Sequence, residues 1–219
     1  MIKANHLGVK FTKEFHALCD VDVCIETGEK VALVGEDGSG KTTFLRVISK
    51  LQKPSEGEVY LHGIALKRVD FKTDLSLGYL PVTPVFDARK NVAENLKSHI
   101  GNGRYSKYEL AQRVDEALCK FGLQKLEKNK IRDLTLFQKY LLSFVRLSFR
   151  QLDVLLIDNI FKNLSNEEQE MILQIINEYA SQSNLTMVVA TSSNEIASKI
   201  SSRQIYFNQG RIENEKNVN

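Results

Sequence analysis

Residues 31–42 read VALVGEDGSGKT, an apolar run that leads straight into a glycine-rich loop. Four consecutive apolar residues are typical of a strand that is buried on both faces of a parallel sheet. Gly35 is followed by four residues and then by Gly40, Lys41 and Thr42, which is the spacing of a phosphate-binding loop between a strand and a helix. A chance glycine turn is the alternative, and the flanking strand and helix pattern argues against it.

The chemistry of this loop favours a nucleoside triphosphate. Glycines allow the backbone to curl so that several amide hydrogens, and the amino end of the following helix, point at one anion. The ammonium of Lys41 adds a positive charge for the terminal phosphates, and the hydroxyl of Thr42 can bind magnesium. The nucleotide-binding residues predicted from the loop are Gly35, Glu36, Asp37, Gly38, Ser39, Gly40, Lys41, Thr42 and Thr43.

A second magnesium partner is predicted at Asp158, which closes the apolar run of residues 154–157. A carboxylate at the end of a buried strand can hold a water molecule on the metal. Asp158 alone could simply end a strand, but the phosphate loop makes a shared metal site with Thr42 the better interpretation. ATP and Mg²⁺ are therefore the expected ligands.

The remaining pattern alternates strands with helices. Apolar residues predict strands near residues 2–11, 21–25, 59–61, 77–80, 154–158 and 185–190, and a hairpin over 204–212 whose polar tail frays. A helix should follow the loop, with an apolar face formed by Leu45, Ile48 and Leu51. A second helix should begin after Ser165, with an apolar face formed by Met171, Ile172, Ile175, Ile176 and Tyr179.

The middle of the chain, about 88–148, has no strong strand pattern and is predicted to be a helical lobe. Within it Ser106 and Glu109 form a capping-box pattern, and Gly122 ends the helix that they begin. We therefore expect one α/β domain over 1–219, with a mostly parallel sheet, an antiparallel β edge and an inserted helical subdomain.

Composition excludes several classes of protein. The chain has 30 Lys and Arg against 27 Asp and Glu, a net charge of +3, which argues against nucleic acid as a partner. The longest apolar runs are far short of the roughly 20 residues that cross a bilayer, and the first residues lack a signal-peptide pattern. Cys19, Cys24 and Cys119 have no partners at metal-binding spacing, so we expect reduced thiols and a cytoplasmic location.

These motifs resemble the ATP-binding domains of ABC transporters, and the likeness runs from about residue 2 to about residue 213. It includes the segments that flank the phosphate loop, residues 27–34 and 53–59. The resemblance implies a core of the P-loop NTPase type, and it makes Phe11 an aromatic residue that stacks on adenine, although Phe11 could equally be a core residue of an edge strand. It also implies a membrane-spanning partner subunit at the inner face of the cell membrane, and a homo- or heterodimer with another such ATP-binding domain.

Several positions depart from the family pattern. Val82 stands in place of the glutamine that senses magnesium and contacts the membrane partner. Residues 134–138, Leu-Thr-Leu-Phe-Gln, align with the signature Leu-Ser-Gly-Gly-Gln, and only the first and last match. Asn159 occupies the position of the water-polarising glutamate, and Ser192 that of the switch histidine. Ser165 replaces the aspartate that contacts the dimer partner.

The substituted positions are those that the family uses for hydrolysis and dimer closure, whereas the phosphate loop and Asp158 are retained. The favoured interpretation is an ATP-binding transporter subunit with slow hydrolysis, which relies on an intact second subunit for most turnover, so no catalytic residue is assigned. The first alternative is a non-hydrolysing regulatory or scaffold module. The second is an active ATPase that uses Glu36, Asp37 or Asn159 in other ways. A phosphotransferase is disfavoured because the helical insertion and the final hairpin match ABC domains.

Overall fold

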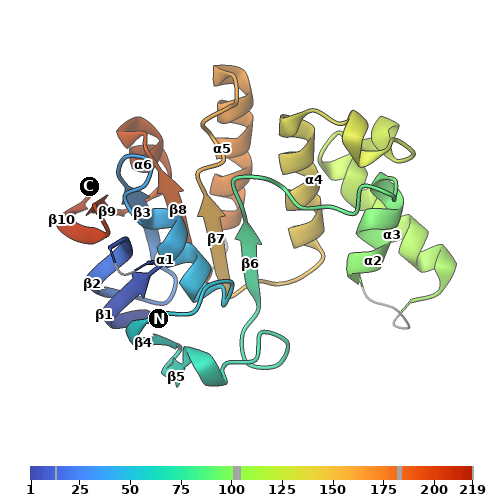
Figure 1. The fold of residues 1–219 in the computed structure, drawn as a ribbon. Coiled ribbons are helices and arrows are strands. Elements are labelled where there is room, and N and C mark those ends of the chain that lie inside the picture. The colour runs from blue at the N-terminus through green and yellow to red at the C-terminus, as the bar shows by residue number, and fades with distance from the viewer. Residues whose placement is uncertain (13, 101–104, 182–183, 219) are drawn as a thin grey trace. The chain divides into compact units, whose positions relative to one another are not determined.

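The computed structural model describes residues 1–12, 14–100, 105–181 and 184–218. Contacts along the chain group these residues into two compact units, which are described separately (Figure 1). The first unit joins Met1–Tyr79 to Leu152–Asn219, and the second is the intervening segment Leu80–Gln151. The expected inserted helical subdomain is therefore confirmed, and the second unit spans Leu80–Gln151 where the sequence predicted a helical lobe over about 88–148.

A six-stranded sheet, in the order β10-β9-β3-β8-β7-β6, carries the phosphate loop. Its strands are β3 (Lys30–Val34), β6 (Leu77–Leu80), β7 (Val154–Asp158), β8 (Thr186–Thr191), β9 (Arg203–Asn208) and β10 (Arg211–Asn217). Strand β3 pairs in parallel with β8 and β9, and β7 pairs in parallel with β8. The predicted parallel sheet is confirmed, and its register brings the ends of β3, β7 and β8 to one edge.

The antiparallel strands form a sheet of their own, in the order β2-β1-β4-β5. They are β1 (Ile2–Lys10), β2 (His16–Ile25), β4 (Glu56–Leu61) and β5 (Ile64–Ala65), followed by the short 3-10 helix η1 (Leu66–Arg68). Gly57, with φ of 75°, is required where β4 meets β1, since a Cβ there would lie 2.3 Å from the carbonyl oxygen of His6. The predicted antiparallel edge is thus confirmed as a second sheet.

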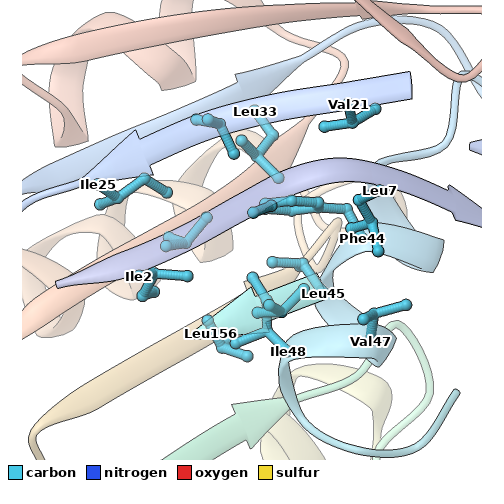
Figure 2. Packing of buried hydrophobic residues seen from close by; sticks show 14 of the residues in the cluster. Ile2, Leu7, Val21, Ile25, Leu33, Phe44, Leu45, Val47, Ile48 and Leu156 are labelled. Carbon is cyan, nitrogen blue, oxygen red and sulfur yellow. The ribbon is translucent and has the colours of Figure 1, made fainter. Parts of the chain in front are cut away.

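Helix α1 (Lys41–Ile48) connects the two sheets through the hydrophobic core of the first unit. Figure 2 shows Leu7 of β1, Phe44 and Leu45 of the helix and Leu156 of β7 among the residues of this core. All four side chains are fully buried. Because buried apolar side chains are the main source of folding free energy, this packing anchors the amino end of α1 directly after the loop.

The predicted extent of this helix was too long. Helix α1 ends at Ile48, and Lys50 takes a left-handed φ of 60°. The backbone N–H of Leu51 then donates to the carbonyl oxygen of Arg46 at 2.9 Å, and that of Lys50 to Val47 at 2.9 Å, which is a Schellman ending. Leu51 is consequently 65% exposed instead of lying on the buried face.

Two helices complete the first unit, α5 (Asn166–Ala180) and α6 (Asn194–Ile200). The capping box of Ser165 and Glu168 is confirmed at the start of α5. Met171 is 50% exposed, however, and Leu173 is buried in its place. The expectation of a fraying tail was also wrong, because β10 pairs with β9 as far as Asn217.

The second unit is built from helices α2 (Val92–Ile100), α3 (Lys107–Lys120) and α4 (Leu136–Ser148), with 3-10 turns η2 (Gln124–Leu126) and η3 (Ile131–Asp133). The capping box of Ser106 and Glu109 is confirmed on α3, which buries Val114 and Leu118. Gly122, with φ of 68°, ends this helix as predicted. None of the helices within the described residues is long and apolar enough to cross a membrane.

Two leucine substitutions test the helix ending. Leu45→Ala removes a fully buried side chain, and we expect it to lower the free energy of unfolding by about 2–5 kcal/mol. Leu51→Ala is the matched control, since its side chain already lies in water, and the expected change is within about 0.5 kcal/mol. Denaturant titration of both variants measures the difference. Comparable losses would mean that Leu51 packs on the core as the sequence first suggested.

Candidate functional site

The phosphate loop is a tight turn between β3 and α1. The backbone N–H of Ser39 donates to the carbonyl oxygen of Glu36 at 3.2 Å, and Gly38 lies at the tip with φ of 81° and open space where a Cβ would stand. Gly40, with φ of 109°, is the N-cap of α1. The N–H groups of the first helical turn have no partners within a helix. They are therefore available to an anion.

The ammonium of Lys41 lies at the centre of this turn, and the residue is only 5% exposed. Its Nζ donates to the carbonyl oxygens of Gly35 at 2.7 Å and Glu36 at 2.8 Å, and to Oγ of Ser39 at 3.0 Å. Burial lowers the pKa of Lys41, while the carboxylates of Asp37 and Asp158 act in the opposite direction. The loop is thus closed around a positive charge.

The two predicted magnesium ligands are brought together. Oγ1 of Thr42 donates to Oδ1 of Asp158 at 2.8 Å, although the residues are 116 positions apart. Asp158 is 1% exposed, and burial raises the pKa of its carboxyl. A hydroxyl and a carboxylate side by side are the hard oxygen ligands that Mg²⁺ takes. These side chains therefore fit the metal that the loop implies.

Tyr79 is a partner of this pair that the sequence analysis did not identify. Its hydroxyl donates to Oδ2 of Asp158 at 3.0 Å, and burial raises the pKa of Tyr79 beyond its usual range. Both carboxylate oxygens of Asp158 are therefore held by hydroxyl donors. The signal in the sequence was the short strand pattern of residues 77–80, but only the order of the sheet shows that β6 lies beside β7.

A hollow of about 130 Å³ opens beside the loop. It is lined by the loop residues from Asp37 to Thr43 and by Phe11, Phe15, Ala17 and Asn159. Phe11 is 51% exposed and stacks on Phe15, with ring centroids 5.8 Å apart, so the alternative of a core phenylalanine is wrong. Phe15 was missed by the sequence analysis. A larger hollow of about 480 Å³, lined by Pro54 and Leu66, includes none of the predicted site residues.

Asn159 and Ser192 directly follow two neighbouring strands, at the same edge of the sheet. Asn159 follows β7 with a left-handed φ of 47°, and its backbone N–H donates to the carbonyl oxygen of Ala190 at 2.9 Å. Its side chain lines the hollow beside the loop. Ser192 follows β8 and is exposed. An amide can orient water but accepts no proton at neutral pH, and a serine hydroxyl carries no charge.

The signature-like segment begins helix α4 in the second unit. Thr135 is its N-cap and forms a capping box with Gln138: the N–H of Gln138 donates to Oγ1 of Thr135 at 3.2 Å, and the N–H of Thr135 donates to Oε1 of Gln138 at 3.0 Å. Leu136 and Phe137 are half-buried in the first turn. Gln138, which matches the family signature, and Thr135, which keeps a hydroxyl in place of the signature serine, therefore start a helix.

Val82, at the position of the family's glutamine, also lies in the second unit. Its carbonyl oxygen accepts a hydrogen bond from the hydroxyl of Tyr140, and the residue is 39% exposed. Its apolar side chain offers neither a metal ligand nor a hydrogen bond.

One other cluster of metal-ligating type occurs in the described part of the chain. Nδ1 of His6 lies 2.8 Å from Asp20 and 3.5 Å from Asp22, and all three residues are exposed. The hydrogen bond to Asp20 raises the pKa of His6. An exposed ion pair accounts for this arrangement.

A buried strand, a glycine turn around a lysine, and a carboxylate from a parallel strand together define a nucleotide-binding domain of the phosphate-loop class. The sequence profile described as ABC transporter matches residues 18–162. The structure is similar to that of the ATP-binding cassette MJ0796, solved as a dimer in a post-hydrolysis state bound to ADP and Pi, with a TM-score of 0.88, 26% identity, and coverage of 100% of this chain and 99% of that one. The chain belongs to the ABC transporter family.

Two curated relatives show how far the similarity extends. The sulfate/thiosulfate import ATP-binding protein of Halalkalibacterium halodurans is 29% identical over 203 residues, which cover 91% of this chain and 57% of that protein. The thiamine import ATP-binding protein of Brucella abortus is 29% identical over 196 residues, which cover 87% of this chain and 79% of that protein. The match thus spans little more than half the length of the first relative.

The raised pKa of Asp158 predicts how the stability of the protein depends on pH. Because burial raises this pKa in the folded protein, the unfolded chain loses its proton first as the pH rises, and stability falls. Asp158→Asn removes that ionisation. Without nucleotide, we expect this variant to melt above the wild type near about pH 7, with a difference that shrinks toward about pH 4.

Thermal unfolding over this pH range measures the effect. Asp115→Asn on α3, whose side chain lies in water, is the control and should follow the wild type. A difference for Asp158→Asn that does not change with pH would show that the buried charge is not its cause.

Proposed function

We propose that the chain is the ATP-binding subunit of an ABC transporter, with the two compact units forming one nucleotide-binding domain over 1–219. The observation that carries the proposal is the phosphate loop closed around Lys41, beside the hydrogen-bonded pair of Thr42 and Asp158. The relatives described above act on different substrates. The similarity shared with them therefore supports a common ATP-binding part and not a substrate site.

In this proposal each part of the site holds one part of Mg²⁺-ATP. The N–H groups of the first turn of α1 and the ammonium of Lys41 bind the phosphates. Thr42 and Asp158 hold the magnesium ion, which neutralises phosphate charge. The stacked rings of Phe11 and Phe15 offer an exposed aromatic surface for the base. Tyr79 fixes the orientation of the Asp158 carboxylate.

We further propose that hydrolysis by this chain alone is slow. Phosphoryl transfer to water depends on positioned groups and charge, and general-base catalysis contributes about 10²–10⁴-fold. Asn159 lines the hollow where a water-polarising group would act, but its amide cannot take up the proton. Ser192 carries no charge that could stabilise the transferred phosphoryl group.

The proposed partners are a membrane-spanning transporter subunit and a second ATP-binding domain. The dimer of the cassette MJ0796 supports pairing of such domains. Leu136 and Phe137 place bulky side chains in the first turn of α4, where glycines would let the backbone approach an anion closely. A related subunit with an intact signature is therefore the better partner than a second copy of this chain. The complex would lie at the inner face of the cell membrane.

Lys41→Ala tests nucleotide binding. The substitution removes the ammonium that closes the loop, and we expect the affinity for Mg²⁺-ATP to fall by about 100-fold or more, since a bond to a charged group contributes about 1.5–3 kcal/mol and the loop loses its shape as well. Titration calorimetry measures the affinity. Saturating Mg²⁺-ATP should also raise the melting temperature of the wild type and leave that of the variant unchanged. Equal affinities would refute the proposed site.

Two substitutions at Asn159 test slow hydrolysis. Asn159→Glu adds a carboxylate that can accept a proton, and we expect phosphate release to rise by about 10-fold or more. Asn159→Gln has the same side-chain length without the carboxylate and should stay slow. The left-handed φ of 47° at this position affects both variants alike. Wild-type release as fast as that of Asn159→Glu would show an active ATPase, whereas binding without release in every variant would favour a regulatory module.

A further inference from the structure

The phosphate loop contains a carboxylate, that of Asp37, whose negative charge disfavours the binding of a triphosphate. Asp37 lies in the turn between Glu36 and Ser39 and lines the hollow beside the loop. An anion placed next to a site for a triphosphate repels the ligand, and the repulsion is felt within about 10 Å at ordinary ionic strength. Lys41 acts on Asp37 but is hydrogen-bonded to the loop backbone, so a second positive charge next to Asp37 would reduce this repulsion further.

Lys162 provides that charge from a different part of the chain. Its Nζ forms an ion pair and hydrogen bond with Oδ2 of Asp37. This contact is the main reason why the pKa of Asp37 is held below its usual value. The pair joins the loop after β3 to the segment that follows β7. Both residues belong to the first compact unit.

The position of Lys162 is held firmly by its neighbours. Phe161 is 2% exposed, and Leu164 is 8% exposed. Nε2 of Gln169 on α5 donates to the carbonyl oxygens of both residues, at 3.2 and 3.0 Å. The backbone that carries Lys162 is therefore anchored in the core, and only the side chain extends over the loop. Fixing the backbone reduces the entropy lost when the ion pair forms.

We propose that Lys162 is a positioning residue for nucleotide binding, which neutralises Asp37 and so permits the triphosphate to enter the loop. The inference rests on the proposed function of the site. Glu36, the other carboxylate of the loop, does not line the hollow, so Asp37 is the charge that matters most. In this proposal Lys162 acts through Asp37 and not by binding the nucleotide itself.

A double-substitution cycle tests this idea. Lys162→Met removes the ion-pair partner of Asp37, and we expect the affinity for Mg²⁺-ATP to fall about five-fold at low salt, the equivalent of an exposed ion pair of about 1 kcal/mol. Asp37→Asn alone should bind as well as the wild type or better. The double variant Asp37→Asn with Lys162→Met should return to within about two-fold of the wild type, because neither charge remains. Titration calorimetry measures all four affinities.

Other outcomes overturn the inference. If the double variant binds as weakly as Lys162→Met, then Lys162 holds the phosphate directly. If Lys162→Met binds like the wild type, the pair has no role in binding. The loss of affinity in Lys162→Met should also become smaller at high salt, because salt screens the charges. Lys162→Arg keeps the positive charge and should bind Mg²⁺-ATP like the wild type. A purely structural role of Lys162 predicts neither result.

Two controls separate this inference from the proposed function. Lys199→Met removes the same charge from an exposed lysine that is also paired with carboxylates, those of Glu170 and Glu195, and it should leave the affinity unchanged. Lys41→Ala reports on the site itself. Loss of binding in Lys41→Ala with an unaffected Lys162→Met would overturn only the role of Lys162, whereas unchanged binding in Lys41→Ala would overturn the proposed function.

Discussion

The buried ammonium of Lys41 is the interaction on which the site depends. A charged group that is 5% exposed must be surrounded by polar partners, and here the loop itself supplies them. The lysine therefore holds in shape a glycine-rich turn that would otherwise be costly to order. The surrounding core keeps α1 directly after the turn, so that the amino end of the helix lies at the loop.

Local patterns predicted the fold well. Each predicted strand is present, and the capping boxes at Ser106 and Ser165 mark helix starts as expected. The main local error was the end of α1, where Lys50 adopts a left-handed conformation that is unusual for a lysine and that the sequence did not predict. Periodicity alone extended the helix to Leu51, since an apolar residue three positions after Ile48 fits the helical pattern.

Only the residues of the candidate site that belong to sequence motifs could be predicted. The loop and the pairing of Thr42 with Asp158 followed from spacing and strand order. Tyr79, Phe15 and Lys162 could not be predicted in the same way, because their contacts with the site depend on which strands are neighbours and on how a connecting segment is anchored. Residues 135–138 have two interpretations. The alignment with the family makes them part of the signature, whereas the structure shows that Thr135 and Gln138 form the capping box of α4.

The register of the parallel sheet has a consequence for how the protein is made. Val34, immediately before the loop, pairs with Thr191 of β8. Thr42 donates a hydrogen bond to Asp158 of β7. The loop emerges from the ribosome before strands β7 and β8, which position it, have been synthesised. Pairings so distant in sequence form slowly. The nucleotide site can therefore be assembled only after β7 and β8 have been synthesised, more than 100 residues after the loop itself.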